Sequence, residues 1–283
     1  MTSSFVKTYA FGGDFLELEP EINLELSIEL SLDGFSFLVK EASTLLCLEH
    51  FAYAKQNDAI DYFEALKELF DQRELSKRKF QKTQIAYHSG AYVVIPKEIF
   101  DESKKEKYYQ FCEPPKEQNL IVYDEIDSIN CVGLYQIHKE AKSILDSFFP
   151  GNGLLSHVTS IIDWFQKTSG LDANDETVVI HLRQNGIDVF WFRNGRFQFF
   201  NSFDCKELTD YIYYLVFFLE QYQVKSEMNK AIVFGDSSVK KEFMEQVRAI
   251  FKDLSQVWPN ECPHYSDFLS EDIRSRFQLL LNF

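Results

Sequence analysis

The chain has 283 residues, 45% hydrophobic and 16% aromatic, which is enough for two compact domains with sizeable cores. Its formal net charge of −15 at pH 7 argues against nucleic acid as a partner, because binding to phosphate backbones relies on Lys and Arg that displace counterions. The five cysteines are scattered, odd in number and without a C-x-x-C pair, which favours a reducing compartment over a disulfide framework.

The N-terminal stretch MTSSFVKTYAFGGDF has no basic segment followed by an apolar one, and no apolar run is long enough to cross a bilayer. We therefore expect a soluble cytoplasmic protein without membrane insertion. Residues 1–21 turn acidic toward Pro20, so we expect a short N-terminal extension outside the core.

Alternating apolar residues then predict a three-stranded antiparallel meander. Asp33-Gly34 suits its first tight turn, because Gly accepts positive φ. Asn57 or Asp58 can cap the helix that follows, in which apolar residues recur at three and four spacing. The expected elements are strands at 24–32, 35–41 and 44–51 and a helix from residue 60 to about 73.

The rest of the first half alternates short strands with helices. Pro96 is expected to open a helix that runs to about Gln110, because a first helical position does not need the amide that proline lacks. The expected elements are strands at 84–87, 92–95, 119–123 and 132–135, a helix through Ile144 and a helix at 157–168.

A polar, turn-rich segment at 169–176 is the best domain boundary, which we place at about residue 172. Two Asn-Gly pairs, at Asn185 and Asn194, then predict tight hairpins in a second meander. The expected elements are this meander at 178–203, a helix at 208–219, a strand at 231–234, a helix at 239–251, a strand at 256–258 and a helix from residue 267.

The second meander repeats the first. Residues 26–51 reappear without a gap at 178–203, an offset of 152, and the turns Asp33-Gly34 and Asn185-Gly186 coincide. The offset drifts only to 149 and then 147 in the helix and strand that follow, so the order of elements is shared. A duplicated α/β architecture follows, with an extension at 1–21, a first lobe at 22–172 and a second lobe at 173–283.

Two copies of meander, helix, strand, helix, strand, helix resemble the plan of the actin-like ATPase superfamily. More narrowly, the chain resembles an uncharacterised Bacteroidetes family with an actin-like fold, through LSIELSLDGFSFLV, AYVVIPKEIF and SHVTSIIDWF. The resemblance implies two ribonuclease-H-like lobes, each a three-stranded antiparallel meander extended by parallel strands with helices on both faces. It implies no established activity.

Active members of that superfamily carry an Asp near the end of each first strand and a Gly two residues later. The carboxylate holds magnesium or its waters, and Gly lets backbone amides approach the phosphates. Laid on this chain, the pattern falls on Glu29 and Ser31 in the first copy and on His181 and Arg183 in the second. Both phosphate loops therefore depart from the pattern of the resemblance.

The third superfamily element is a strand followed by Gly-Gly and a helix, which packs against adenosine. The matching stretch IVFGDSS keeps Gly235 but has Asp236 in place of the second Gly. Ser237 and Ser238 can cap the next helix, whose N-terminus is a natural anion site. Since Asp236 already supplies an anion, an ordinary strand-to-helix turn is the favoured interpretation.

Other constellations do not predict chemistry. Cys47 with His50, and Cys262 with His264, offer two ligands each, which do not make a tetrahedral metal site. His88-Ser89-Gly90 lacks the G-x-S-x-G turn that presents a nucleophilic serine, so we interpret it as a loop. We expect no metal site and assign no catalytic residue.

Two hypotheses remain. The first is a non-catalytic binding or scaffold protein, a pseudo-ATPase without cofactor, whose interlobe cleft holds a small molecule, a peptide or nothing. The second is a divergent ATP-binding enzyme, an ATPase or kinase-like phosphotransferase, in which Glu29 handles magnesium and Arg183 contacts phosphate. Under either hypothesis the cleft residues are Glu29, Ser31, His181, Arg183, Gly235 and Ser237.

Overall fold

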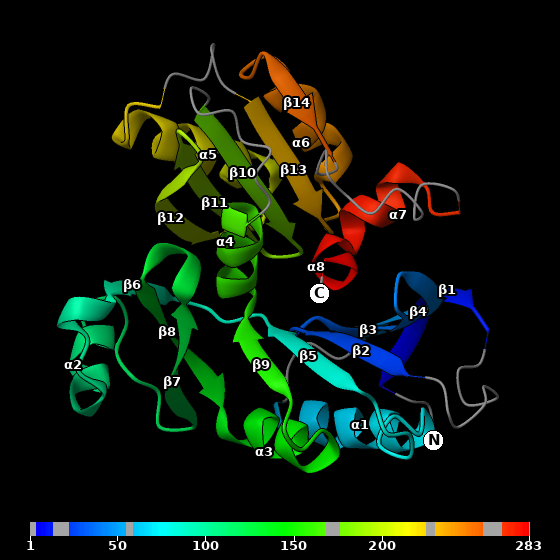
Figure 1. Ribbon diagram of the computed structural model, residues 1–283. Coiled ribbons are helices and arrows are strands. Elements are labelled where there is room, and N and C mark those ends of the chain that lie inside the picture. The colour runs from blue at the N-terminus through cyan, green and yellow to red at the C-terminus, as the bar shows by residue number, and fades with distance from the viewer. Residues whose placement is uncertain are drawn as a thin grey trace.

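The computed structural model describes residues 4–13, 23–54, 59–167, 176–224, 230–256 and 268–282. They form two lobes, one above the other in Figure 1, with helices α4 (His157–Lys167) and α8 (Gln278–Leu281) between them. A short helix, α7 (Glu271–Arg276), leads from the second lobe into α8.

The first lobe is built on a six-stranded sheet in the order β1-β4-β3-β2-β5-β9. Strands β2, β3 and β4 form the antiparallel meander, and β5 and β9 extend it in parallel. Apolar residues on both faces of β3 are buried, so both faces of the sheet are covered. The strands are β1 (Phe5–Gly12), β2 (Leu24–Leu30), β3 (Gly34–Glu41), β4 (Thr44–Tyr53), β5 (Lys82–Tyr87) and β9 (Gly153–Ser156).

Helices α1 (Ala59–Gln72) and α3 (Lys139–Phe148) cover the outer face of this sheet, at the bottom of Figure 1. Between β5 and β9 the chain inserts a separate three-stranded antiparallel sheet in the order β6-β8-β7, with a short helix against it. The inserted elements are β6 (Tyr92–Pro96), α2 (Lys105–Tyr109), β7 (Asn119–Ile126) and β8 (Cys131–His138).

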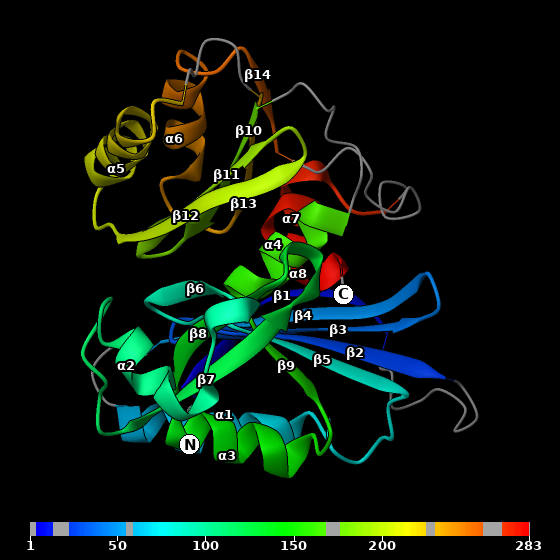
Figure 2. The same ribbon diagram turned by 60° about the vertical axis from the view of Figure 1, so that its left-hand side comes forward.

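The second lobe has a five-stranded sheet in the order β12-β11-β10-β13-β14. Helices α5 and α6 pack on one of its faces, away from α4 (Figure 2). Its elements are β10 (Glu176–Arg183), β11 (Gly186–Arg193), β12 (Arg196–Asp204), α5 (Leu208–Gln221), β13 (Lys230–Gly235), α6 (Lys240–Val247) and β14 (Asp253–Ser255).

The predicted duplication is confirmed by the strand order. The series β4-β3-β2-β5-β9 in the first lobe corresponds strand for strand to β12-β11-β10-β13-β14 in the second. One hydrogen bond is also repeated: the Tyr62 hydroxyl donates to the Ser31 carbonyl at 2.6 Å, and the Tyr211 hydroxyl donates to the Arg183 carbonyl at 2.8 Å. Ser31 and Arg183 are 183 − 31 = 152 residues apart, the offset of the sequence repeat.

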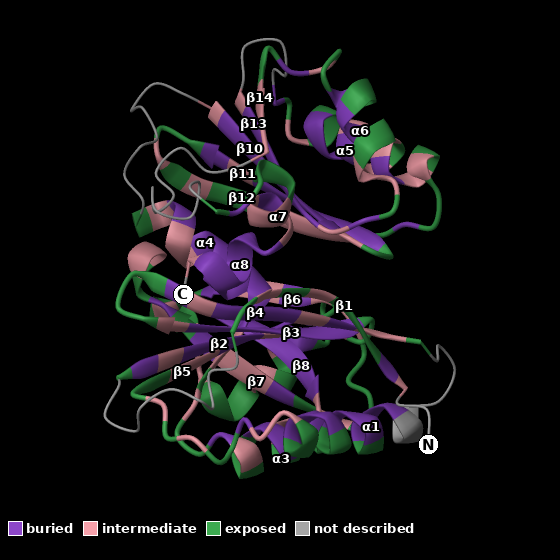
Figure 3. Ribbon diagram, turned by 90° about the vertical axis from the view of Figure 1, so that its right-hand side faces the viewer, coloured by how far each residue is buried: buried purple, intermediate pink, exposed green. Residues whose placement is uncertain are grey.

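The core is continuous across the lobes. Ile161, Ile162 and Phe165 of α4 are fully buried in the same apolar cluster as residues of both sheets, and Figure 3 shows α4 and α8 as buried elements between the lobes. Phe192 stacks on Phe165 with ring centroids 5.3 Å apart. Phe190, two residues earlier on the same strand, is also fully buried.

Three strands differ from the sequence expectation. The predicted N-terminal extension contains β1, which pairs with β4 and buries Phe5. Most other β1 residues are exposed or half-buried, so no alternating apolar pattern marked the strand. Strand β9 has only four residues and was not predicted, and β14 lies at Asp253–Ser255 rather than at 256–258.

The helix expected from Pro96 to Gln110 is interrupted. A 3-10 turn at Lys97–Ile99 ends at Phe100, which is extended, and the Asp101 carboxylate then accepts a hydrogen bond from the Ser103 amide. This local Asp–Ser hydrogen bond starts a new turn, so only Lys105–Tyr109 is α-helical. Residues 14–21, the proposed caps Asn57 and Asp58, the boundary near 172 and residues 257–258 lie outside the described residues.

Candidate functional site

A polar row crosses each sheet at equivalent positions. In the first lobe, Glu29 of β2 pairs with Ser36 of β3, which pairs with His50 of β4. In the second lobe the corresponding row is His181, Asp188 and Ser202 on β10, β11 and β12. Each residue lies 152 positions after its counterpart, since 181 − 29, 188 − 36 and 202 − 50 all equal 152.

A cavity of about 670 Å³ separates the two rows, and we call it the interlobe cleft. Four of the six predicted site residues line it, two from each lobe: Glu29, Ser31, His181 and Arg183. Residues that the sequence analysis did not assign to a site also line it, among them His50, His88, Asp204, Asp236 and Arg276.

The other two predicted residues, Gly235 and Ser237, do not line the cleft and have roles in the local packing. Gly235 has φ +98°, and a Cβ there would stand 2.2 Å from the Leu182 carbonyl oxygen, so the position needs glycine for packing against β10. Ser237 is buried, and its hydroxyl oxygen accepts a long hydrogen bond from the Val239 amide at 3.4 Å. Of this turn, only Asp236 is part of the cleft lining.

The tips of the two meander hairpins touch across the cleft. The Asn185 amide group donates to an Asp33 carboxylate oxygen at 3.3 Å, and the two residues are again 152 positions apart. In the first hairpin, the Ser31 hydroxyl oxygen accepts from the backbone amides of Asp33 at 3.2 Å and Gly34 at 3.1 Å. The amides of this turn therefore already have an acceptor within the chain.

Asp188 organises the second-lobe side of the site. It is fully buried, and one of its oxygens accepts from His157 Nε2 and from His181 Nδ1, each at 3.0 Å. Arg183 Nε donates to both oxygens at 3.0 and 3.1 Å, and the Ser202 hydroxyl donates at 2.6 Å. Burial alone would raise the pKa of Asp188, but Arg183 and then His157 outweigh it and hold that pKa well below its usual value.

Burial favours the neutral form of the two histidines that bind Asp188. Burial, with the neighbouring His88, lowers the pKa of His157 to about 3, and burial likewise lowers the pKa of His181. Because the Asp188 carboxylate only accepts, His181 must carry its proton on Nδ1, which leaves a lone pair on Nε2. His157 carries its proton on Nε2, and its buried Nδ1 has no hydrogen-bond partner among the described residues.

On the first-lobe side, His88 Nε2 lies 2.7 Å from an oxygen of Glu29. Burial would raise the pKa of Glu29, but the hydrogen bond and charge of His88 outweigh it and lower that pKa. The His88 ring stacks on His157 with centroids 4.5 Å apart and planes at 3°. His88 therefore lies between the carboxylate of its own lobe and the imidazoles beside Asp188.

Two groups of these side chains have metal-ligand geometry. Glu29, His88 and His181 bring one carboxylate oxygen and two ring nitrogens within 4.8 Å of one another, and so do His157, His181 and Asp188. The first group lines the interlobe cleft and the second is fully buried. The expectation that the chain has no metal site rested on Cys–His pairs, whereas these groups assemble from distant segments.

The sequence contained one unused signal for His88. Its amide donates to the Leu30 carbonyl at 2.8 Å, and the Asp236 amide donates to the Leu182 carbonyl at 3.0 Å. His88 and Asp236 are therefore equivalent positions at an offset of 236 − 88 = 148, one more than the offset taken from the strand sequences. At this offset His88 takes the place of Asp236, directly after the strand that pairs with the strand of Glu29.

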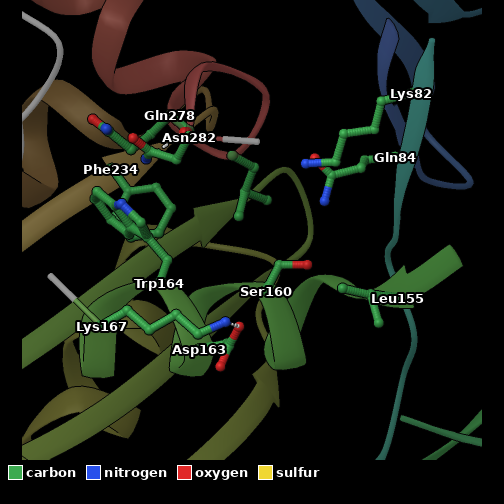
Figure 4. A pocket seen from close by; sticks show the side chains of 11 residues that line it. Lys82, Gln84, Leu155, Ser160, Asp163, Trp164, Lys167, Phe234, Gln278 and Asn282 are labelled. Carbon is green, nitrogen blue, oxygen red and sulfur yellow. Dashed lines mark hydrogen bonds and ion pairs between the residues drawn. The ribbon is translucent and has the colours of Figure 1, made fainter. Parts of the chain in front are cut away.

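A second, smaller cavity of about 210 Å³ lies along α4. Figure 4 shows Lys82 and Gln84 of β5 on one side of it and Trp164 with Phe234 on the other. Lys167 and Asp163, which also line it, are ion-paired within α4. The cavity has no cluster of imidazole and carboxylate groups, so the interlobe cleft is the better candidate site.

The family described as "Protein of unknown function (DUF3822)" matches residues 16–254. A Bacteroides thetaiotaomicron protein with actin-like ATPase fold and unknown function is 23% identical, with a TM-score of 0.75 over 93% of this chain and 96% of that one. A PilM-PilN type IV pilus biogenesis complex contains a chain that is 12% identical, with a TM-score of 0.56 over 93% of this chain and 98% of that one.

These likenesses confirm the actin-like fold and the family resemblance. No curated protein shows significant similarity to the chain. Among the helices of the described ranges, none combines the length and apolar character needed to span a membrane.

Proposed function

The chain belongs to the family described as protein of unknown function (DUF3822), and we propose that it is a non-catalytic binding or scaffold protein on an actin-like ATPase fold. In this proposal the interlobe cleft takes a small molecule or a segment of a partner protein. It does not take a nucleoside triphosphate or nucleic acid, and the protein acts in a reducing, cytoplasmic setting.

The observation that carries the proposal is the state of the first hairpin. A phosphate cradle needs backbone amides that are free to donate to the ligand. Here the Ser31 hydroxyl already accepts from the amides of Asp33 and Gly34. A phosphate would have to break these two hydrogen bonds and also separate Asp33 from Asn185 of the opposite hairpin.

Charge supports the same conclusion. Arg183 and Arg276 line the cleft, but each is paired with a carboxylate, Asp188 at 3.0 Å and Asp236 at 2.7 Å. A triphosphate would therefore meet few unpaired positive groups and several negative ones. The acidic residues of the cleft lining are Glu29, Asp33, Asp204 and Asp236.

A protein of the same fold occurs in the PilM-PilN complex, so the architecture is compatible with a role in assembly. At 12% identity this likeness concerns the fold alone. It supports partner binding as a class of function and does not identify a partner.

Titration with ATP and magnesium tests the proposal. Calorimetry on the full chain should give no saturable heat, and ATP with magnesium should not raise the thermal unfolding temperature. Cooperative unfolding in the same buffer is the control that the protein is folded. A dissociation constant in the micromolar range or below would contradict the proposal.

The alternative, a divergent ATP-binding enzyme, is favoured by one observation: Glu29 and Arg183, the residues assigned to magnesium and phosphate, do line one cleft. If binding is seen, Glu29→Ala and Arg183→Ala should each abolish it while the protein stays folded. Unchanged affinity in both variants would remove these residues from the nucleotide site.

A further inference from the structure

We propose that Glu29, His88 and His181 form a divalent metal site of the zinc type, with three protein ligands and a remaining coordination position that opens onto the interlobe cleft. The site goes beyond the proposed binding function, because it needs neither a nucleotide nor a partner. It would also join the lobes, since Glu29 and His88 come from the first lobe and His181 from the second.

The donor set fits zinc. Two imidazole nitrogens and one carboxylate oxygen, with a fourth position left open, form the ligand set of one class of catalytic zinc sites. The three donor atoms lie within 4.8 Å of one another. Magnesium prefers an octahedron of oxygens at short distance, so two histidines argue against it.

His181 already has the orientation of a metal ligand. Its Nδ1 donates to Asp188, which fixes the ring and leaves the Nε2 lone pair for a ligand. Its ring also stacks on Phe234, with centroids 4.9 Å apart and planes at 27°. Metal-bound histidines typically have such a carboxylate partner on the other ring nitrogen, and Asp188 supplies it here.

Glu29 and His88 already point at one another. Their oxygen and Nε2 atoms are 2.7 Å apart, and the His88 ring donates to the carboxylate. Two ligands of a tetrahedral zinc ion stand about 3.3 Å apart, given zinc–ligand bonds of about 2.0 to 2.1 Å. The ion would displace the Nε2 proton of His88 to Nδ1 or to solvent, and the two side chains would separate by a few tenths of an ångström.

The competing group, His157, His181 and Asp188, is less suited to an ion. Both Asp188 oxygens already accept hydrogen bonds, and Arg183 places a positive charge against them. His157, His181 and Asp188 are all nearly or fully inaccessible to solvent. Asp188 therefore acts as a positioning residue for His181, while Glu29 and His88 face the cleft.

The electrostatics of the cleft favour a cation. Its two arginines are held in ion pairs, and its acidic lining attracts a divalent ion. A ligand oxygen or a water in the open position would then be bound by the metal. Small molecules or peptide ends with a carboxylate are the chemical class suited to that position.

The test is zinc binding by the full chain after treatment with a chelator, measured by competition with a chromophoric chelator. We expect one zinc ion per chain, a higher unfolding temperature with zinc, and visible absorption bands when cobalt is used instead. His88→Gln and Glu29→Gln should each lower zinc affinity by at least roughly 100-fold. That is the loss that can follow when a hydrogen-bond partner of a metal ligand is removed, and these variants remove the ligands themselves.

Two matched variants serve as controls. His50→Gln removes a histidine that lines the same cleft but binds Ser36 instead, at 2.7 Å, and should leave zinc affinity unchanged. His157→Gln should weaken zinc binding less than His88→Gln does. A cooperative unfolding transition, measured without metal, shows whether each variant is folded.

Three results would overturn the proposal. One is the absence of a stoichiometric zinc ion in the folded wild type. Another is wild-type affinity in both folded Glu29→Gln and folded His88→Gln. The third is a loss of affinity in His157→Gln that exceeds the loss in His88→Gln, which would move the ion to the buried group. None of these outcomes depends on whether ATP binds.

Discussion

At the scale of single residues, Asp188 carries the most interactions in the site. It accepts hydrogen bonds from His157 of α4, His181 of β10, Arg183 at the end of β10 and Ser202 of β12. Its counterpart in the first lobe is Ser36, so the duplicated sheets differ in charge at this position. The buried charge of Asp188 is balanced by Arg183, whose Nη2 also donates to Ser202 at 2.8 Å.

Asp188→Ala should destabilise the protein by about 3 to 5 kcal/mol, because removing one partner of a buried ion pair leaves the other charge uncompensated. Urea unfolding followed by circular dichroism measures this change. The matched control is Asp204→Ala, an exposed aspartate that lines the same cleft, with an expected change within about 0.5 kcal/mol. A loss below about 1 kcal/mol for Asp188→Ala, the worth of an ordinary hydrogen bond, would contradict this account.

At the scale of elements, α4 connects the parts of the molecule. An oxygen of Asp124, on β7 of the inserted sheet, accepts from the Ser156 amide at 2.8 Å and from the Thr159 hydroxyl at 2.6 Å. The other oxygen accepts from Tyr135 at 3.1 Å. Asp124 therefore fixes the first turn of α4 against the inserted sheet, and α4 also contacts β12 of the second lobe.

Asp124 should give stability an unusual pH dependence. Burial raises its pKa from 3.8 to about 6, against the lowering effect of Thr159, Ser156 and Tyr135. Between these values the folded state holds a proton that the unfolded chain has released, so the unfolded chain binds fewer protons. The contribution of Asp124 is therefore fully present below pH 3.8 and is lost as the pH rises to about 6.

The measurement is the free energy of unfolding in urea at several pH values, for the wild type and for Asp124→Asn. The Asn oxygen can accept from Ser156 and Thr159, and its amide can donate to the Tyr135 hydroxyl, so the hydrogen bonds survive without the titration. The full shift of roughly two pKa units is worth about 3 kcal/mol, and relative to the variant the wild type should lose about 2 kcal/mol of it between pH 4 and pH 6. If the unfolding free energy of the wild type minus that of Asp124→Asn stays constant or grows with pH, the raised pKa of Asp124 is refuted.

The elements that the sequence predicted are those with a strong local pattern. Both meanders and the helices α1, α4 and α5 lie where apolar periodicity and the Asp-Gly and Asn-Gly turns put them. Strand β1 is mostly exposed, and β9 and β14 are short, so none of them carries a recognisable apolar pattern. These strands form by pairing with the strands beside them. The prediction of one continuous helix after Pro96 was wrong, because a hydrogen bond to the Asp101 side chain competes with continuation of the helix.

The same distinction applies to the site. Glu29 and His181 were found because the repeat places them at equivalent positions on local hairpins. His88 and His157 were not found, because they reach the site through parallel strand pairing and through the position of α4 between the lobes. Such long-range placement depends on the assembled sheet, and apart from the repeat offset at His88 it leaves no spacing signal in the chain.

At the scale of the whole molecule, the C-terminal helix joins the lobes. Helix α7 contacts β13 of the second lobe, and α8 contacts β2 and β3 of the first lobe and α4 between them. Leu280 of α8 is fully buried in a cluster with Leu38 and Leu48. The lobes therefore share a core at α4 and a tether at α8, and we expect them to unfold in one transition.

Leu280→Ala should lower the free energy of unfolding by about 2 to 5 kcal/mol, since it removes buried methyl groups and leaves a cavity at the tether. Urea unfolding followed by circular dichroism and by tryptophan fluorescence measures it, with Trp164 on α4 and Trp191 on β11 among the reporters. Both midpoints should shift together. Leu120→Ala, at a site 40% exposed on β7, is the matched control and should change stability by less than about 0.5 kcal/mol. An unchanged midpoint in Leu280→Ala, or a shift in only one probe, would mean that the lobes do not depend on this tether for their stability.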